Sequence, residues 1–311
     1  MAISAGANVL VLGRGPVMLL AAKLAALRGY STTVAVAEDY KDAKDAPKLI
    51  FGAKNENEDI PLIILPASPS TAGFDPNVAR AAIAAADAVI IAFDDDNTVD
   101  DSILNTWVPQ DRSGAKHISF MSRYLNGKGM GPIAAGAKLA GNMEIWAARP
   151  PEVAKHKAAD QAVVARANAL GASYTVIRAG TLKGGGSGGV TNGGNGDARF
   201  LDPFIYDPAC ESGSGTTDFI NWKLLFDCET LGVKLVGGDT LPGPGFTAAL
   251  SSISEKACEG DSGRGGVAEA LVEALACESA ANGDFSVGTA EGKSAPSREE
   301  WATMFASAAR G

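Results

Sequence analysis

A short turn near the N-terminus carries residues whose types and spacing suit phosphate binding. It reads Gly13-Arg14-Gly15-Pro16-Val17 and separates an apolar run from a helical pattern. Gly13 permits a tight turn, and Gly15 lets the backbone approach a pyrophosphate because no Cβ stands in the way. Pro16 suits a first helical turn, where its missing N–H would be an orphan, and helix N-terminal amides attract phosphate. These five residues are therefore predicted to bind a dinucleotide.

Two acids follow the turn at the distance expected for a ribose contact. Glu38 and Asp39 follow the next apolar run, and Glu38 lies at about the 20-residue offset of a dinucleotide fingerprint. A carboxylate there accepts hydrogen bonds from ribose hydroxyls and repels a 2′-phosphate. The pattern therefore predicts NAD or NADP as the cofactor and favours NAD, with Lys41 and Lys44 as the counter-argument because either could fold back.

Position 18 departs from the fingerprint. The third glycine of G-x-G-x-x-G would fall there, and the chain has Met18. That glycine serves close helix–strand packing, so Met18 is expected to push the helix outward or to turn aside.

The alternative interpretation is an α/β fold that keeps the turn and binds nothing. If the site is real, Gly15→Val is expected to abolish dinucleotide binding and to leave the fold intact.

The elements around this turn alternate between strand and helix patterns, which predicts a doubly wound, Rossmann-type α/β fold with a parallel sheet. Phe93 ends a continuously apolar strand and is an expected cofactor contact, because ligands lie at the carboxyl ends of such strands. The expected strands are 8–12, 30–37, 60–67, 88–93, 116–122 and 173–178, and the expected helices are 17–27, 75–86, 133–148 and 152–170.

The regular alternation of strand and helix patterns ends near residue 180, and a glycine-rich stretch follows. This change predicts a dinucleotide-binding domain over 1–180 and a small C-terminal lobe over 181–311. The stretch 184–196 is rich in glycine and is either a mobile lid or a floppy insertion. Helices are expected at 217–231 and 267–277, with a strand at 284–287. Ser297 and Glu300 form a capping box that opens a last helix.

The net charge of −9 argues against a nucleic-acid or anionic membrane partner. No apolar run reaches the roughly 18 residues of a membrane span. The cysteines, Cys210, Cys228, Cys258 and Cys277, show no C-x-x-C spacing, which argues against a metal site and for reduced thiols. We expect a soluble protein of a reducing compartment, either the cytoplasm or an organelle such as the plastid stroma after removal of a targeting peptide.

Several segments resemble one family. Gly171-Ala-Ser-Tyr-Thr-Val-Ile-Arg178-Ala-Gly180 is similar to the SGL-x-YTI-x-RPG segment of the atypical short-chain dehydrogenase/reductases, the NAD(P)H-binding, NmrA-like group. Residues 264–272 resemble the family's R-x-D-VA-x-AL helix, with Gly266 for the usual aspartate. Residues 284–287 and 299–301 resemble its closing strand and helix. The resemblance implies a Rossmann domain followed by a substrate-side lobe, with Arg178 beside the cofactor.

The wider family uses Tyr-x-x-x-Lys, in which tyrosine passes a proton to the substrate while hydride leaves the nicotinamide. Lys157 aligns best with that lysine, although Val153 stands where the tyrosine should be and Lys155 is a rival. A literal match, Tyr124-Leu-Asn-Gly-Lys128, follows the fifth strand. The expected catalytic set is Tyr124, Lys157 and Ser122, which matches a family serine, and carbonyl reduction is expected to be slow or absent.

An acidic run, Asp94-Asp95-Asp96-Asn97, ends the fourth strand. These carboxylates would repel a pyrophosphate unless they point to solvent or hold a cation. The favoured interpretation is that they lie in solvent at the N-terminus of a helix, where the helix dipole favours aspartate. Two hypotheses follow. One is an NAD(P)-binding, weak oxidoreductase. The other is a non-catalytic accessory or assembly subunit of a larger plastid or respiratory complex, which uses the Rossmann scaffold to bind a protein partner.

Overall fold

The computed structural model describes residues 2–36, 62–68, 70, 73–94, 98–145, 150–185, 231–242, 260–292 and 294–310. Glu38, Asp39, most of the glycine-rich stretch and all but the last residue of the predicted helix 217–231 lie outside these ranges. The predictions that concern them remain predictions.

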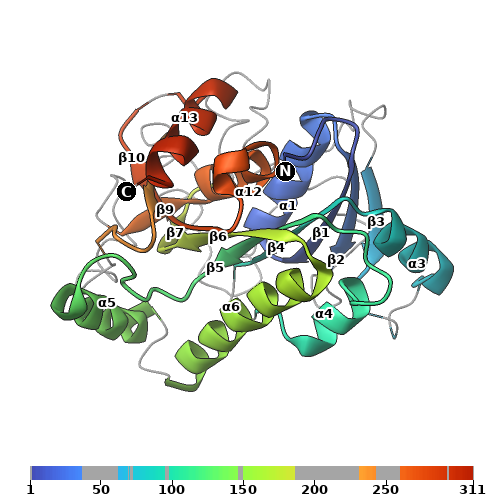
Figure 1. Ribbon diagram of the computed structural model, residues 1–311, viewed down its shortest axis with the longest axis horizontal. Helices are drawn as coiled ribbons and strands as arrows, with labels where there is room; N and C mark the ends of the chain where they lie inside the picture. The colour runs from blue at the N-terminus through green and yellow to red at the C-terminus, as the bar shows by residue number, and fades with distance from the viewer. Residues whose placement is uncertain are drawn as a thin grey trace, which may run out of the picture.

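Among the described residues, eight strands form one sheet in the order β3-β2-β1-β4-β5-β6-β10-β8 (Figure 1). Neighbouring strands are parallel, except that β8 runs antiparallel to β10. The order reverses between the central strands β1 and β4, and the carboxyl ends of these two strands are the switch point of a doubly wound sheet. The predicted Rossmann-type fold is confirmed. The strands are β1 Asn8–Arg14, β2 Ser31–Val36, β3 Leu62–Pro66, β4 Ala88–Phe93, β5 His117–Ser122, β6 Ser173–Ala179, β8 Gly232–Gly237 and β10 Gly283–Ala290.

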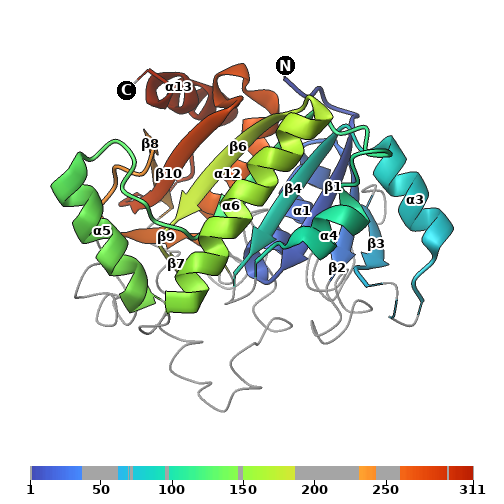
Figure 2. The same ribbon diagram turned by 60° about the horizontal axis from the view of Figure 1, so that its bottom comes forward.

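Helices cover both faces of the sheet (Figures 1 and 2). One core cluster joins the sheet to α1 (Pro16–Leu27), α12 (Arg264–Ala276) and α13 (Arg298–Ala308). The other core cluster joins the opposite face to α3, α4 and α6. Their bounds are Pro76–Ala85, Asp101–Trp107 and Pro150–Leu170. Helix α5 (Pro132–Ile145) lies beyond the sheet edge. Within the described ranges, no helix combines the length and the apolar composition that crossing a bilayer requires.

Helix α1 is apolar except for Lys23, and protein surrounds it. Its residues from Pro16 to Ala26 are buried, with the sheet on one side and α12 on the other. A helix with a single polar residue belongs in such an interior position. Met18 has no exposed surface and packs within this core.

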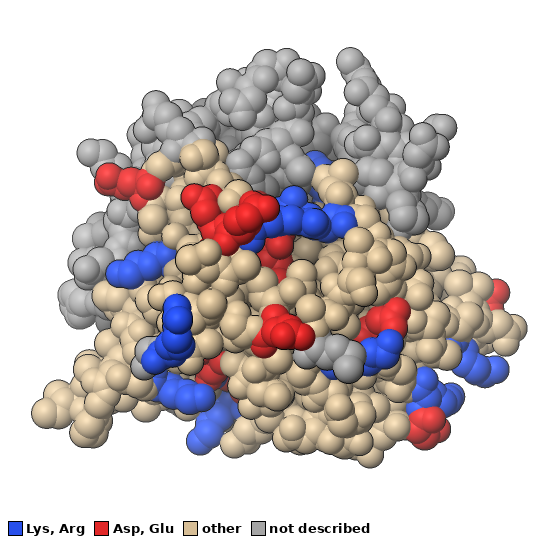
Figure 3. Space-filling model, turned by 45° about the horizontal axis from the view of Figure 1, so that its top comes forward, with Lys and Arg blue, Asp and Glu red and all other residues tan. Residues whose placement is uncertain are grey.

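The C-terminal part of the chain is built into the same sheet. It supplies β10 and β8, and it supplies β9 (Asp261–Gly263), which pairs with β7 (Thr181–Lys183) in a small second sheet. The short strands β7, β8 and β9 and the helix α4 were absent from the sequence-based expectation, because runs of three to seven residues carry little periodicity. On the face shown in Figure 3, acidic and basic side chains are interspersed without a continuous basic patch.

Candidate functional site

The turn between β1 and α1 needs its glycines for contacts within the protein. Gly13 has φ +134°, and a Cβ there would lie 1.7 Å from the carbonyl oxygen of Ala92 in β4. Gly15 has φ +93°, and its Cβ would lie 2.6 Å from the Cβ of Asp94. Both positions therefore exclude a side chain before any ligand is considered. The expectation that Gly15→Val leaves the fold intact is wrong, because valine would meet Asp94 in a strained backbone conformation.

The carboxylate of Asp94 occupies the place where a phosphate would meet the helix. Its Oδ1 accepts a hydrogen bond from the Val17 amide at 3.0 Å. Pro16, the first helical residue, has no N–H. Of the first two helical residues only Val17 has an amide hydrogen, and it donates that hydrogen to Asp94. A helix N-terminus attracts an anion, and here the anion belongs to the chain itself.

Two arginines complete the surroundings of Asp94. The Arg264 Nε lies 3.0 Å from Asp94 Oδ2, and its Nη1 donates to the carbonyl of Gly184. Arg123 Nη1 donates to the Asp94 carbonyl oxygen at 2.7 Å. Burial raises the pKa of Asp94, and Arg264, the Val17 amide and Arg123 oppose this. The expectation of a solvated carboxylate is wrong for Asp94, and residues 95–97 lie outside the described ranges.

Two other predicted cofactor contacts lie around the same turn. Arg14 is half-buried at the end of β1. Phe93 is buried in the core cluster shared with α3 and α4, on the face of the sheet opposite α1. Both flank the switch point, and their predicted contact with a dinucleotide remains a prediction.

A second polar cluster lies at the carboxyl ends of β5 and β6, beside the start of β10. Arg178 is 4% exposed and binds Asp284 through two hydrogen bonds, Nε to Oδ1 at 2.7 Å and Nη2 to Oδ2 at 2.9 Å. Its Nη1 donates to Asp160 Oδ2 at 2.8 Å and also reaches Ser122 and the Tyr124 carbonyl. Burial opposes the charge of Arg178, but Asp284 and Asp160 outweigh it and raise the pKa.

Ser122 is a member of this cluster. Its hydroxyl donates to Asp160 Oδ1 at 2.6 Å and accepts from the Tyr124 amide at 3.1 Å. Burial raises the pKa of Asp160, while Arg178 and Ser122 act against the rise. The serine hydrogen is therefore directed at a carboxylate inside the protein.

The surroundings of Tyr124 raise its pKa on balance. Burial is the largest cause, and the charges of Asp160 and Asp239 add to it, while the nearby Arg178 guanidinium acts in the other direction. A proton donor in this chemistry needs a nearby cation that lowers the pKa. Lys128, the partner in the literal Tyr-x-x-x-Lys match, has a side chain that is 64% exposed and pairs with Asp284 at 3.5 Å.

The side chains that helix α6 buries are not those of the lysines expected at the site. Lys157 and Lys155 are exposed, whereas His156 and Asp160 are buried four residues apart. A spacing of four places two residues on one helix face, so that face carries a histidine and an aspartate. The structure thus brings Ser122, Arg178 and the Tyr124 backbone together and leaves Lys157 apart from them.

Sequence reasoning missed the residues that anchor the Tyr124 loop. Asp239 has no exposed surface and accepts from the amides of Asn126 and Gly127, and its carboxylate pairs with the buried Lys138. Ser286 in β10 donates to the same carboxylate at 3.0 Å. These partners are over 40 residues apart in the chain, and no local spacing signals them.

Comparisons with known proteins identify related folds only. No family model and no curated protein matches the sequence. Matching solved structures include a short-chain dehydrogenase/reductase (wide type) from Veillonella parvula in complex with NADP, at 14% identity and a TM-score of 0.49, covering 91% of this chain and 94% of that one.

Two further matches are Gre2 from Candida albicans in complex with NADPH and the oxidoreductase ylbE from Lactococcus lactis. The first has 11% identity and a TM-score of 0.48, over 92% of this chain and 79% of that one. The second has 11% identity and a TM-score of 0.47, over 98% and 97%. At these values function has to be argued from the site.

Proposed function

We propose that this Rossmann-fold protein is non-catalytic and acts as a subunit that binds a protein partner, with its dinucleotide site closed by its own Asp94 carboxylate. The observation that carries the proposal is the hydrogen bond from the Val17 amide to Asp94, completed by the Arg264 ion pair. A pyrophosphate would have to displace a carboxylate that is already paired with Arg264 and hydrogen-bonded to the Val17 amide, and the negative charge of that carboxylate would repel it.

The second polar cluster supports the absence of turnover. Hydride transfer to a carbonyl needs a proton donor at the substrate oxygen, and loss of a general acid costs roughly 10²–10⁴ in rate. The Ser122 hydroxyl is directed at Asp160, and the pKa of Tyr124 is raised. Helix α5 supports a partner-binding role, because Ile133 is 92% exposed and Leu139 is 38% exposed on an element outside the sheet.

The second candidate is an NAD(P)-dependent reductase. The glycine turn at the switch point of a doubly wound sheet favours it, because dinucleotides bind at that position in such folds. In this case Asp94 has to leave the Val17 amide when the dinucleotide enters. The preference for NAD over NADP would then depend on Glu38, as the sequence predicts.

Calorimetric titration with NADH and with NADPH separates the two candidates. The proposal predicts no binding to the wild type at concentrations up to about 1 mM. Asp94→Ala frees the Val17 amide and leaves Arg264 without its carboxylate, so this variant is expected to gain affinity. Asp111→Ala, an exposed aspartate elsewhere, is the control and should behave as wild type. Micromolar binding to the wild type, with turnover of quinones or aldehydes, would establish the reductase.

A further inference from the structure

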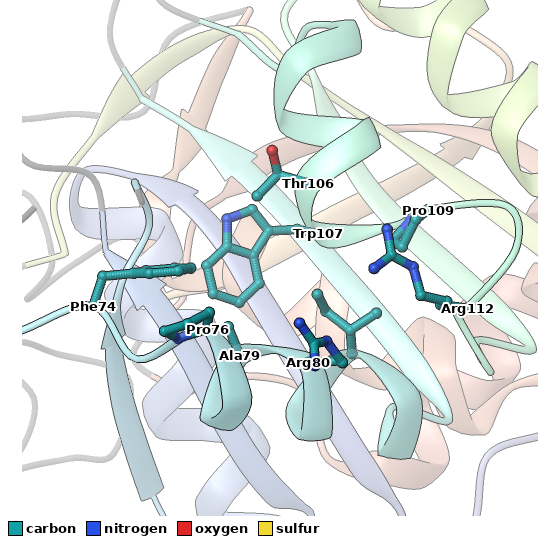
Figure 4. Close-up of a pocket in the computed structure, with 9 residues that line it drawn as sticks. Phe74, Pro76, Ala79, Arg80, Thr106, Trp107, Pro109 and Arg112 are labelled. Carbon is teal, nitrogen blue, oxygen red and sulfur yellow. The ribbon is translucent and has the colours of Figure 1, made fainter. Parts of the chain in front are cut away.

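A pocket lies on the face of the sheet opposite α1, between α3 and the loop that follows α4 (Figure 4). Its volume is about 160 Å³. Its apolar walls come from Phe74, Ile83, Trp107 and Pro109, and two arginines also line it, Arg80 from α3 and Arg112 from the loop.

The pocket as a whole has a volume close to that of a cavity that holds one six-membered ring. Trp107 is 2% exposed, and its indole N–H donates to the carbonyl of Ala67 at 2.8 Å. Phe74 meets the indole edge-on, with ring centroids 6.3 Å apart. With its N–H engaged, Trp107 offers the pocket only ring surface. An apolar cavity of about 150 Å³ accommodates benzene.

The two arginines add a positive charge to this opening. Both are exposed, and Figure 4 shows them on the side of the pocket away from Phe74. Arg112 meets Asp111 at 3.3 Å, a pair whose side chains are 56% and 73% exposed. Among the described residues, Arg80 has no ion-pair partner. In a chain of net charge −9, two guanidinium groups at one pocket mark a place suited to an anion.

We propose that this pocket binds a small aromatic carboxylic acid. The ring enters the space between Trp107 and Ile83, and the carboxylate lies between Arg80 and Arg112. Guanidinium groups match the planar carboxylate and can bind it through two hydrogen bonds. The inference is independent of the dinucleotide site, which lies at the N-terminus of a helix on the opposite face.

Calorimetric titration with 3-phenylpropionate tests the inference. We expect saturable binding by the full-length protein, and affinity at least about tenfold lower for the neutral 3-phenylpropionamide, because the charge-assisted bonds are lost. Arg80→Gln and Arg112→Gln should each weaken binding of the acid by about tenfold and leave binding of the amide unchanged. Arg310→Gln, an exposed arginine on the last turn of the chain, is the matched control.

Three outcomes would overturn the inference. They are an absence of heat with the acid up to about 10 mM, equal affinities for the acid and the amide, and glutamine variants that bind the acid as wild type does. A fourth arm uses the peptide Gly-Gly-Phe with a free C-terminus. Tighter binding of this peptide than of the free acid would assign the pocket to a protein C-terminus and would also overturn the small-molecule inference.

Discussion

Asp94 shows at the scale of one residue how a sequence motif can be kept for contacts within the protein. The glycines at 13 and 15 match a dinucleotide fingerprint. Gly13 is also required by the close approach of Ala92 in β4, and Gly15 by that of the Asp94 side chain. Asp94 itself accepts the hydrogen bond from the Val17 amide, which a phosphate at this helix N-terminus could otherwise accept. Its buried charge is balanced by Arg264, so both carboxylate oxygens of Asp94 have partners within the protein.

The first prediction concerns Gly13. A methyl group there would lie 1.7 Å from the Ala92 oxygen, in a backbone conformation that side chains rarely adopt. Gly13→Ala should therefore lower the free energy of unfolding by at least about 3 kcal/mol, measured by urea denaturation. Gly136→Ala is the control, because a Cβ in that helix meets nothing within 4 Å. Alanine there should stabilise by up to about 1 kcal/mol. Equal midpoints for the two variants would refute the prediction.

The second prediction concerns His117 and pH. Burial lowers its pKa to about 4, from an ordinary value of 6.5, and its ring nitrogens lie 2.7 Å from Ser173 Oγ and 3.0 Å from Thr175 Oγ1. The unfolded state then binds the proton more strongly. Stability is full above pH 6.5 and falls toward pH 4, by about 3 kcal/mol at roughly 1.4 kcal/mol per pH unit.

Urea denaturation at pH 7 and pH 4.5 measures this effect. His117→Gln removes the titrating group, so its loss of stability between the two pH values should be smaller than that of the wild type. If the free energy of unfolding fell by the same amount in both proteins, carboxylates alone would account for the loss of stability at acid pH.

At the scale of elements, burial of a helix face decides which of its residues can act. Helix α6 turns His156 and Asp160 inward and Lys157 outward, which removes Lys157 from the Ser122 cluster. Helix α1 is buried from Pro16 to Ala26, so its sides are closed to a ligand. The last helix, by contrast, begins with a capping box that is visible in the sequence and present in the structure.

The third prediction tests that cap. Ser297 Oγ accepts from the Glu300 amide at 3.3 Å, and the Glu300 carboxylate accepts from the Ser297 amide at 2.7 Å. Ser297→Ala should lower the free energy of unfolding by about 1 kcal/mol. Ser307→Ala, at an exposed position of the same helix, should be neutral or slightly stabilising. Thermal unfolding followed by circular dichroism measures both, and an equal change in the two variants would argue against the cap.

The whole molecule is held together by its C-terminal part. The strand β10 pairs with β6, α12 packs on α1, and Arg178 binds Asp284 across that strand pair. The predicted boundary at residue 180 therefore runs through a continuous sheet and a shared core. The division into 1–180 and 181–311 remains a prediction that an experiment can decide.

The fourth prediction concerns a fragment of residues 1–185. Without α12 and β10, it would expose one side of α1 and the edge of β6, and leave Arg178 without Asp284. Removing so much apolar contact should abolish cooperative unfolding in a circular dichroism melt, whereas the full chain should show a single transition. A cooperative transition in the fragment would support two independent units.

Periodicity and turn chemistry alone determined most of the fold. The βαβ unit, the six parallel strands and the cap at Ser297 follow from apolar spacing and from residues that act on their near neighbours. The short strands β7, β8 and β9 were beyond that reasoning, because pairing with distant chain is what makes them strands.

The candidate site depended on tertiary structure. Glycines and a helix N-terminus look the same in the sequence whether a phosphate or a side chain fills the space before them. Only folding places Asp94 against Val17, 77 positions away, and Arg264 against Asp94, 170 positions away. Contacts of that range depend on strand order and helix packing, which sequence spacing does not specify.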